Sequence, residues 1–139
     1  MRNFLITILC SIFCLSCGAQ NSQNIELKGT KWECKIAEGF INTYEFATDT
    51  TFTFLSCEMD DKYFGDYYFK DGFLILDQKG SVYDKDFSNS STHKAERKLY
   101  KLKIKEGELK HLSVSDWING KWVKSSFKFD DSYTYKKIN

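Results

Sequence analysis

Proline is absent from the 139-residue chain, and histidine occurs only twice, as His93 and His111. Because proline cannot donate a ladder hydrogen bond, its absence leaves β-strands without interruption. Two histidines are too few for a convincing zinc site. The acidic loops also lack the glycine and terminal glutamate of a calcium-binding loop. We therefore expect no metal and no cofactor.

Motifs for nucleophilic catalysis are also absent. Ser113 or Ser115 could be grouped with His111 and Asp116 as a triad. However, alternating serines on a strand usually fill the pleat, and no nucleophile elbow precedes them. The sequence predicts that this protein is not an enzyme.

An excess of charge of one sign is missing as well. The chain has 20 basic and 19 acidic residues, and it is neutral once Arg2 is removed with a leader. Neutrality excludes bulk nucleic-acid binding, which needs clustered positive charge. Acids exceed bases in residues 25–93, and bases exceed acids in residues 94–139. The two segments could neutralise each other within one domain, or their separation could steer a charged partner.

The N-terminal segment has the layout of a bacterial export signal. Arg2 precedes an apolar run at residues 4–15, and small residues follow at 16–19. This run is too short to span a bilayer stably, but it fits the apolar region of a signal peptide. We expect the protein to be exported, as an outer-membrane lipoprotein or a periplasmic protein.

Two cleavage sites compete in this segment. The sequence CLSCG at residues 14–18 resembles a lipobox, in which the cysteine becomes the acylated N-terminus. That reading makes residues 1–16 a lipoprotein signal peptide, Cys17 the lipidation site and residues 17–26 a flexible tether. Membrane contact would then come from the N-terminal lipid only. The alternative is ordinary signal-peptidase cleavage before Gln20.

Only Cys34 and Cys57 then remain in the folded body. An even pair in an oxidising compartment could form one disulfide. Alternatively, both could be buried thiols that pack as small hydrophobic side chains. Both outcomes stay open at the level of sequence.

Apolar and polar residues alternate in short runs, which is typical of β-strands. Strands are expected at residues 32–36, 44–46, 52–54, 65–70, 73–77, 100–105, 109–115 and 121–129, and a last run at 133–138 either pairs or trails. The pairs Asp71-Gly72, Glu106-Gly107 and Asn119-Gly120 mark hairpin turns. We predict an all-β, eight- to nine-stranded antiparallel up-and-down barrel over residues 27–139, because closure removes sheet edges.

One long polar stretch interrupts this pattern at residues 78–96. It is expected to form either a mobile loop or a short helix that caps one end of the barrel. Long loops of this kind often carry function.

Several short motifs give a resemblance to a known group. The motifs are LKGTKWE at residues 27–33, YEF at 44–46, DTTF at 49–52 and GDY at 65–67. Together they resemble the small lipocalin-like domains of Gram-negative lipoproteins. The resemblance implies a lipocalin-like (calycin) barrel that carries a small hydrophobic ligand.

The aromatic residues are the candidate ligand-binding residues. Those expected on inward faces are Trp32, Tyr44, Phe46, Phe52, Phe54, Tyr67, Phe69 and Tyr100. The interior of an eight-stranded barrel can either be filled by side chains or hold one small ligand. Trp117 and Trp122 flank a turn at one rim, where they could close the barrel or contact a partner. We expect a monomeric ligand carrier; the alternative is a protein-binding envelope module or a peptidase inhibitor that presents barrel loops.

Overall fold

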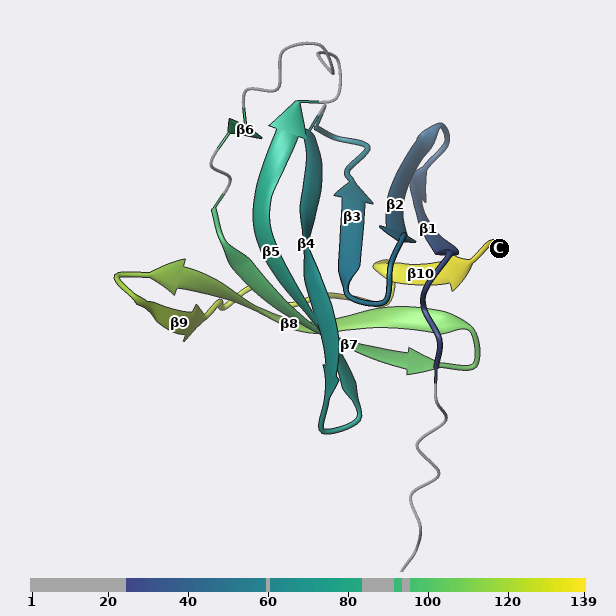
Figure 1. The fold of residues 1–139 in the computed structure, drawn as a ribbon. Helices are drawn as coiled ribbons and strands as arrows, with labels where there is room; N and C mark the ends of the chain where they lie inside the picture. The colour runs from purple at the N-terminus through teal and green to yellow at the C-terminus, as the bar shows by residue number, and fades with distance from the viewer. Residues whose placement is uncertain (1–24, 60, 84–91, 94–95) are drawn as a thin grey trace, which may run out of the picture.

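The computed structural model describes residues 25–59, 61–83, 92–93 and 96–139 (Figure 1). The expected signal peptide, Cys17 and most of the expected tether lie outside these residues. The strands, in chain order, are β1 (Thr30–Ala37), β2 (Phe40–Phe46), β3 (Thr51–Leu55), β4 (Asp61–Lys70), β5 (Phe73–Tyr83), β6 (Thr92–His93), β7 (Lys98–Lys105), β8 (Glu108–Ile118), β9 (Lys121–Lys124) and β10 (Thr134–Lys137). No helix occurs in the described part of the chain.

Eight of these strands close into an antiparallel barrel, in the order β1-β2-β3-β4-β5-β7-β8-β10 and back to β1. Closure comes from β10, which pairs with β8 at Thr134–Lys110 and with β1 at Trp32–Lys137. Strand β9 is an extra strand on the far part of β8, and the hairpin they form projects from the barrel in Figure 1. The predicted all-β, up-and-down barrel is therefore confirmed.

The last run pairs, which is one of the two outcomes that the sequence left open, and as β10 it closes the barrel. Two expectations about strand ends need correction. Strand β9 ends at Lys124, earlier than expected, because the chain must leave β8 to reach β1. The polar stretch at residues 78–96 begins as strand, since β5 runs to Tyr83 against Asp61 of β4. The register between β4 and β5 shifts beside Gly65 and interrupts the alternation of inward and outward residues. The strand predicted from that alternation therefore ends too early.

The three predicted hairpin turns are present. Asp71, Glu106 and Asn119 each have φ between 50° and 54°, and the glycine after each also has positive φ. Such paired positive φ values belong to the tight turns that match strand twist. The dipeptides therefore fixed the register of three hairpins.

Seven apolar side chains of the barrel interior are completely packed, and we call them the apolar core. Its members, all at most 2% exposed, are Leu27, Phe46, Phe52, Leu74, Leu76, Leu102 and Leu109. Burial of each such side chain stabilises the fold by about 1.5–3 kcal/mol. The buried polar side chains of the interior are therefore the place to look for a site.

A β-bulge determines which side chains of β8 point into the barrel interior. The register between β7 and β8 shifts between Lys101 and Leu102, which pair with Ser113 and His111. Leu112 is therefore the extra residue and is 47% exposed, whereas His111 faces inward. Without the bulge, alternation would place either His111 or Val114 on the wrong face.

Candidate ligand site in the barrel interior

Four side chains from four strands form the interior polar cluster: Tyr44 of β2, Tyr100 of β7, His111 of β8 and Tyr135 of β10. The ring centroid of His111 lies 5.8 Å from Tyr44, 5.4 Å from Tyr100 and 5.6 Å from Tyr135. The Tyr100 ring meets His111 edge to face. Barrel closure brings these residues together, because β10 and β8 are adjacent only in the closed sheet.

His111 is neutral in the folded protein. Burial lowers its pKa from 6.5 to about 3, because the charged imidazolium would lose its hydration. Its Nε2 lies 3.2 Å from the hydroxyl of Tyr44, within hydrogen-bond distance. Its Nδ1 has no hydrogen-bond partner among the described residues, although it is buried.

The tyrosines of the cluster stay protonated. Burial raises the pKa of Tyr44 well above its usual value, and the neighbouring Tyr135 and Tyr100 raise it further. Burial likewise raises the pKa of Tyr100 and of Tyr135. The cluster therefore offers neutral hydroxyl and imidazole groups, and it carries no charge at physiological pH.

The other buried polar side chains of the interior have partners. Oδ1 of Asn42 accepts a hydrogen bond from the backbone N–H of Cys57 at 2.8 Å. Nε2 of Gln78 donates to the carbonyl of Glu96 at 3.1 Å. Ser81 donates to Asp61 at 3.4 Å. In the described part of the chain, the unpaired Nδ1 of His111 is therefore an exception to the rule that buried polar atoms are satisfied.

Partly exposed aromatic rings connect the cluster to the surface. The Phe54 ring lies 4.6 Å from Tyr44 and 6.0 Å from Tyr63, and both Phe54 and Tyr63 are half-buried. On the other side, the half-buried Phe129 lies 4.6 Å from His111. These three rings are thus less completely covered than the apolar core.

Most of the predicted ligand residues do face inward. Trp32, Tyr44, Phe46, Phe52 and Tyr67 are buried in the core. Phe54 and Tyr100 are partly buried against it. Trp32 donates to Thr30 Oγ1 at 2.9 Å, so its one polar group is already satisfied.

Phe69 does not lie in the interior and is 47% exposed. It pairs with the inward-facing Leu74, as alternation predicts. However, β3 begins at Thr51, which pairs with Asp66, so Phe69 lies beyond the end of the neighbouring strand. The prediction that Phe69 lines the interior is therefore wrong, because parity does not show where a neighbouring strand stops.

The two body cysteines are both free thiols in the structure. Cys34 is buried and its Sγ donates to the carbonyl of Ser132 at 3.1 Å. Burial raises its pKa, which disfavours the reactive thiolate. Cys57 is half-buried and follows β3. The structure thus has no disulfide between them, and of the two thiols only Cys34 is fully buried.

A second aromatic group lies where the β8–β9 hairpin begins. Trp117 and Trp122 are cross-strand partners whose ring centroids are 4.9 Å apart. The guanidinium of Arg97 lies 5.2 Å and 5.1 Å from the two rings and forms two hydrogen bonds to the carboxylate of Asp77. Arg97 therefore joins the projecting hairpin to β5 through charge and stacking.

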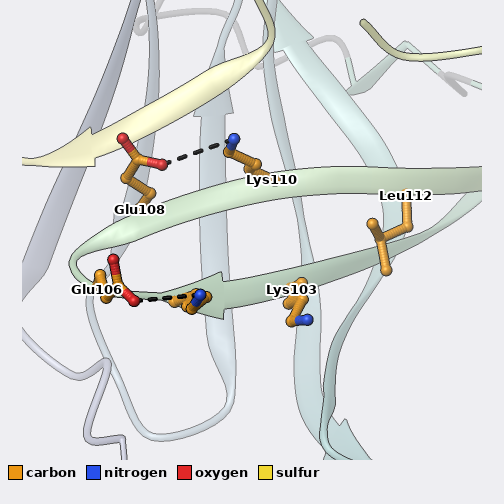
Figure 2. Close-up of a pocket in the computed structure, with 6 residues that line it drawn as sticks. Lys103, Glu106, Glu108, Lys110 and Leu112 are labelled. Atoms are coloured by element: carbon orange, nitrogen blue, oxygen red, sulfur yellow. Dashed lines mark ion pairs between the residues drawn. The ribbon is translucent and has the colours of Figure 1, made fainter. Parts of the chain in front are cut away.

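A hollow of about 300 Å³ lies on the outer face of the β7–β8 hairpin, as Figure 2 shows. It is lined by Lys103, Lys105, Glu106, Glu108, Lys110 and Leu112. Ion pairs join Lys105 to Glu106 at 3.2 Å and Lys110 to Glu108 at 3.7 Å. Such exposed pairs contribute little to stability or affinity, so the interior is the better candidate site.

Sequence reasoning missed three residues of the interior site: His111, Tyr135 and Phe129. The sequence makes His111 a candidate only for a catalytic triad, and the bulge that places both His111 and Val114 on the inward face is not visible in the sequence. Tyr135 and Phe129 become neighbours of His111 only because β10 closes the barrel.

In the described ranges, no group of three or more His, Cys, Asp or Glu side chains is placed to hold a metal ion. The same residues contain no helix that is long and apolar enough to cross a membrane. No family model, no curated protein and no solved structure matches this chain.

Proposed function

We propose that this protein is an exported, lipid-anchored, lipocalin-like barrel that binds a small hydrophobic ligand in the interior beside the polar cluster. The observation that supports binding most strongly is the contrast between the apolar core and the aromatic rings that surround the cluster. Tyr44 and Tyr135 are as buried as the apolar core, at 2% exposed, whereas Phe54, Tyr100 and Phe129 beside them are half-buried. Concave, mostly apolar sites with a few polar groups are the usual ligand sites of proteins.

A fluorescent apolar probe tests ligand binding. The mature chain without Cys17, which begins at Gly18 and therefore carries no lipid, is titrated with N-phenyl-1-naphthylamine, whose emission rises in apolar surroundings. Phe54→Asp places a carboxylate beside the ligand and should weaken binding by about tenfold or more, since burying an unpaired charge costs more than 1.4 kcal/mol. Leu55→Asp is the matched control, because Leu55 points to the outer face and is 36% exposed. Equal affinities for the two variants would contradict interior binding.

Intact-mass measurement of the protein from its own envelope tests the anchor. The proposal predicts an N-terminal Cys17 that carries a diacylglyceryl mass, and loss of membrane association in Cys17→Ser. An N-terminus at Gln20 without acyl mass would contradict lipidation and would favour plain secretion.

Binding of a protein partner is the second candidate function, and the β8–β9 hairpin favours it. Trp117 is 42% exposed, Ile118 47% and Val123 38%. Tryptophan and arginine are the residues most enriched at binding hot spots. A photoreactive residue at position 118 should then crosslink one defined partner, and Trp117→Ala should abolish that product. Absence of any crosslink in the native envelope would contradict this function.

A further inference from the structure

Nδ1 of His111 is a buried polar atom in the interior without a partner in the described chain. His111 is 9% exposed, and three aromatic rings lie within 5.6 Å of its ring centroid. An unsatisfied buried polar atom destabilises a protein, and its desolvation is recovered when a partner arrives. A ligand group that hydrogen-bonds to Nδ1 would recover this cost.

Either tautomer of the neutral imidazole leaves Nδ1 with one unmet need. If the Tyr44 hydroxyl donates to Nε2, the proton is on Nδ1, which then needs an acceptor. If Nε2 donates to Tyr44 instead, Nδ1 carries a lone pair and needs a donor. A hydroxyl group can satisfy both cases, because it donates and accepts.

The surroundings of Nδ1 select against charged groups. No Lys or Arg occurs among the buried residues that the structure describes. A carboxylate or phosphate would therefore lose its hydration beside His111 without gaining a cation. The surrounding rings of Tyr100, Phe129 and Tyr135 instead fit an apolar body.

We infer that Nδ1 of His111 is the hydrogen-bonding anchor for the polar end of the ligand, which is an uncharged hydroxyl compound with an apolar, ring-sized or larger body. This inference rests on the proposed interior site and specifies its ligand class. It gives His111 a positioning role in binding, and no role in catalysis.

Two probes of the same shape isolate the hydroxyl: p-cresol and p-xylene, which differ by one hydroxyl in place of one methyl. Affinities of both are measured for the mature chain and for His111→Phe. The ratio of the two dissociation constants should shift against p-cresol by about tenfold in His111→Phe, which is the usual worth of one buried hydrogen bond. His111→Asn should restore part of the preference. The asparagine amide also has a polar atom bonded to Cγ, in the place that Nδ1 takes in histidine.

Ser81→Ala is the matched control. It also removes a buried hydroxyl, but Ser81 lies outside the polar cluster and its hydroxyl already donates to Asp61 at 3.4 Å. The preference for p-cresol should therefore stay within about twofold of that of the parent chain. An equal loss in both variants would contradict a specific role for His111.

Nitrogen-15 spectra of the unmutated protein give a readout that does not depend on a variant's folding. Addition of p-cresol should move the Nδ1 resonance of His111, and p-xylene should not. If both probes bind inside the barrel and Nδ1 does not respond, the inference about His111 is overturned while the proposed function stands. If neither probe binds, the proposed interior site fails, and the inference fails with it.

Discussion

The hydroxyl of Tyr44 and Nε2 of His111 lie 3.2 Å apart, although the two residues are 67 positions apart in the sequence. Strands β2 and β8 are not neighbours in the sheet, so this contact crosses the barrel interior. Because this contact is buried, a charged His111 would lose the hydration of its imidazolium, and the neutral form is favoured. The protonation of one histidine is therefore coupled to the stability of the whole barrel.

Stability should fall in mild acid because of this histidine. The unfolded chain binds a proton at His111 near pH 6.5, but the folded chain does so only near pH 3, because burial lowers the pKa. The unfolded state is thus favoured as the pH falls from 6.5 toward 3, and the contribution is constant above pH 7. Between pH 7.5 and pH 5 the loss should be about 2 kcal/mol.

Urea unfolding of the mature chain and of His111→Phe at these two pH values measures the effect. The difference between the two proteins removes the contributions of all other titrating groups. Between pH 7.5 and pH 5, the free energy of unfolding should fall by about 2 kcal/mol less in His111→Phe than in the mature chain. Parallel pH dependences would show that His111 is not buried as a neutral group.

Replacement of Gly65 should be among the most damaging changes in the sheet. A Cβ at this position would lie 2.8 Å from the carbonyl carbon of Asp77 and would overlap its carbonyl oxygen, so the backbone would have to move. Gly65→Ala should cost about 3 kcal/mol or more in the free energy of unfolding. Gly80→Ala is the matched control: its Cβ meets only the Phe64 ring, at 2.9 Å, and a side chain can shift. Chemical denaturation should rank the two variants in that order, and the reverse order would contradict the register.

The two free cysteines should differ in reactivity. Cys34 is 2% exposed, and burial raises its pKa, whereas Cys57 is half-buried. Iodoacetamide should add to the folded chain from Gly18 once, at Cys57, and twice after unfolding. Intact mass counts the adducts. Zero adducts under both conditions would indicate a disulfide between the two residues.

Arg97→Lys should loosen the β8–β9 hairpin although it keeps the positive charge. Lysine cannot form two parallel hydrogen bonds to Asp77 while it stacks on Trp117 and Trp122. Backbone amides of residues 117–124 should exchange several-fold faster, and the tryptophan emission should change. The control is Lys121→Arg on the same hairpin, which should leave both readouts unaltered. Unchanged exchange in Arg97→Lys would mean that the hairpin is held by its ladder alone.

Local patterns were enough to predict the fold but not the candidate site. Alternation around Tyr44 and Phe52, together with turns such as Asn119-Gly120, predicted the strands and their hairpins. Those signals are local, so they require no knowledge of distant contacts. Bulges beside Gly65 and at Leu112 shift the inward face where alternation alone would continue, and the second of them lets both His111 and Val114 face inward.

The strand pairing that closes the barrel is the other element that local patterns did not provide. The last run could be read as a strand, but its two partners could not be identified from alternation. Tyr135 joins the interior polar cluster only because β10 lies between β8 and β1. Phe69 shows the converse error, since its parity is inward but no strand covers it.

Native mass spectrometry of the protein, purified from its own envelope in mild detergent, tests the carrier function most directly. The proposed function predicts a mass above that of the acylated chain, which is lost on denaturation and appears as one small, uncharged hydroxyl compound in the extract. Recovery of only the acylated chain, with no bound molecule in any preparation, would contradict the carrier function.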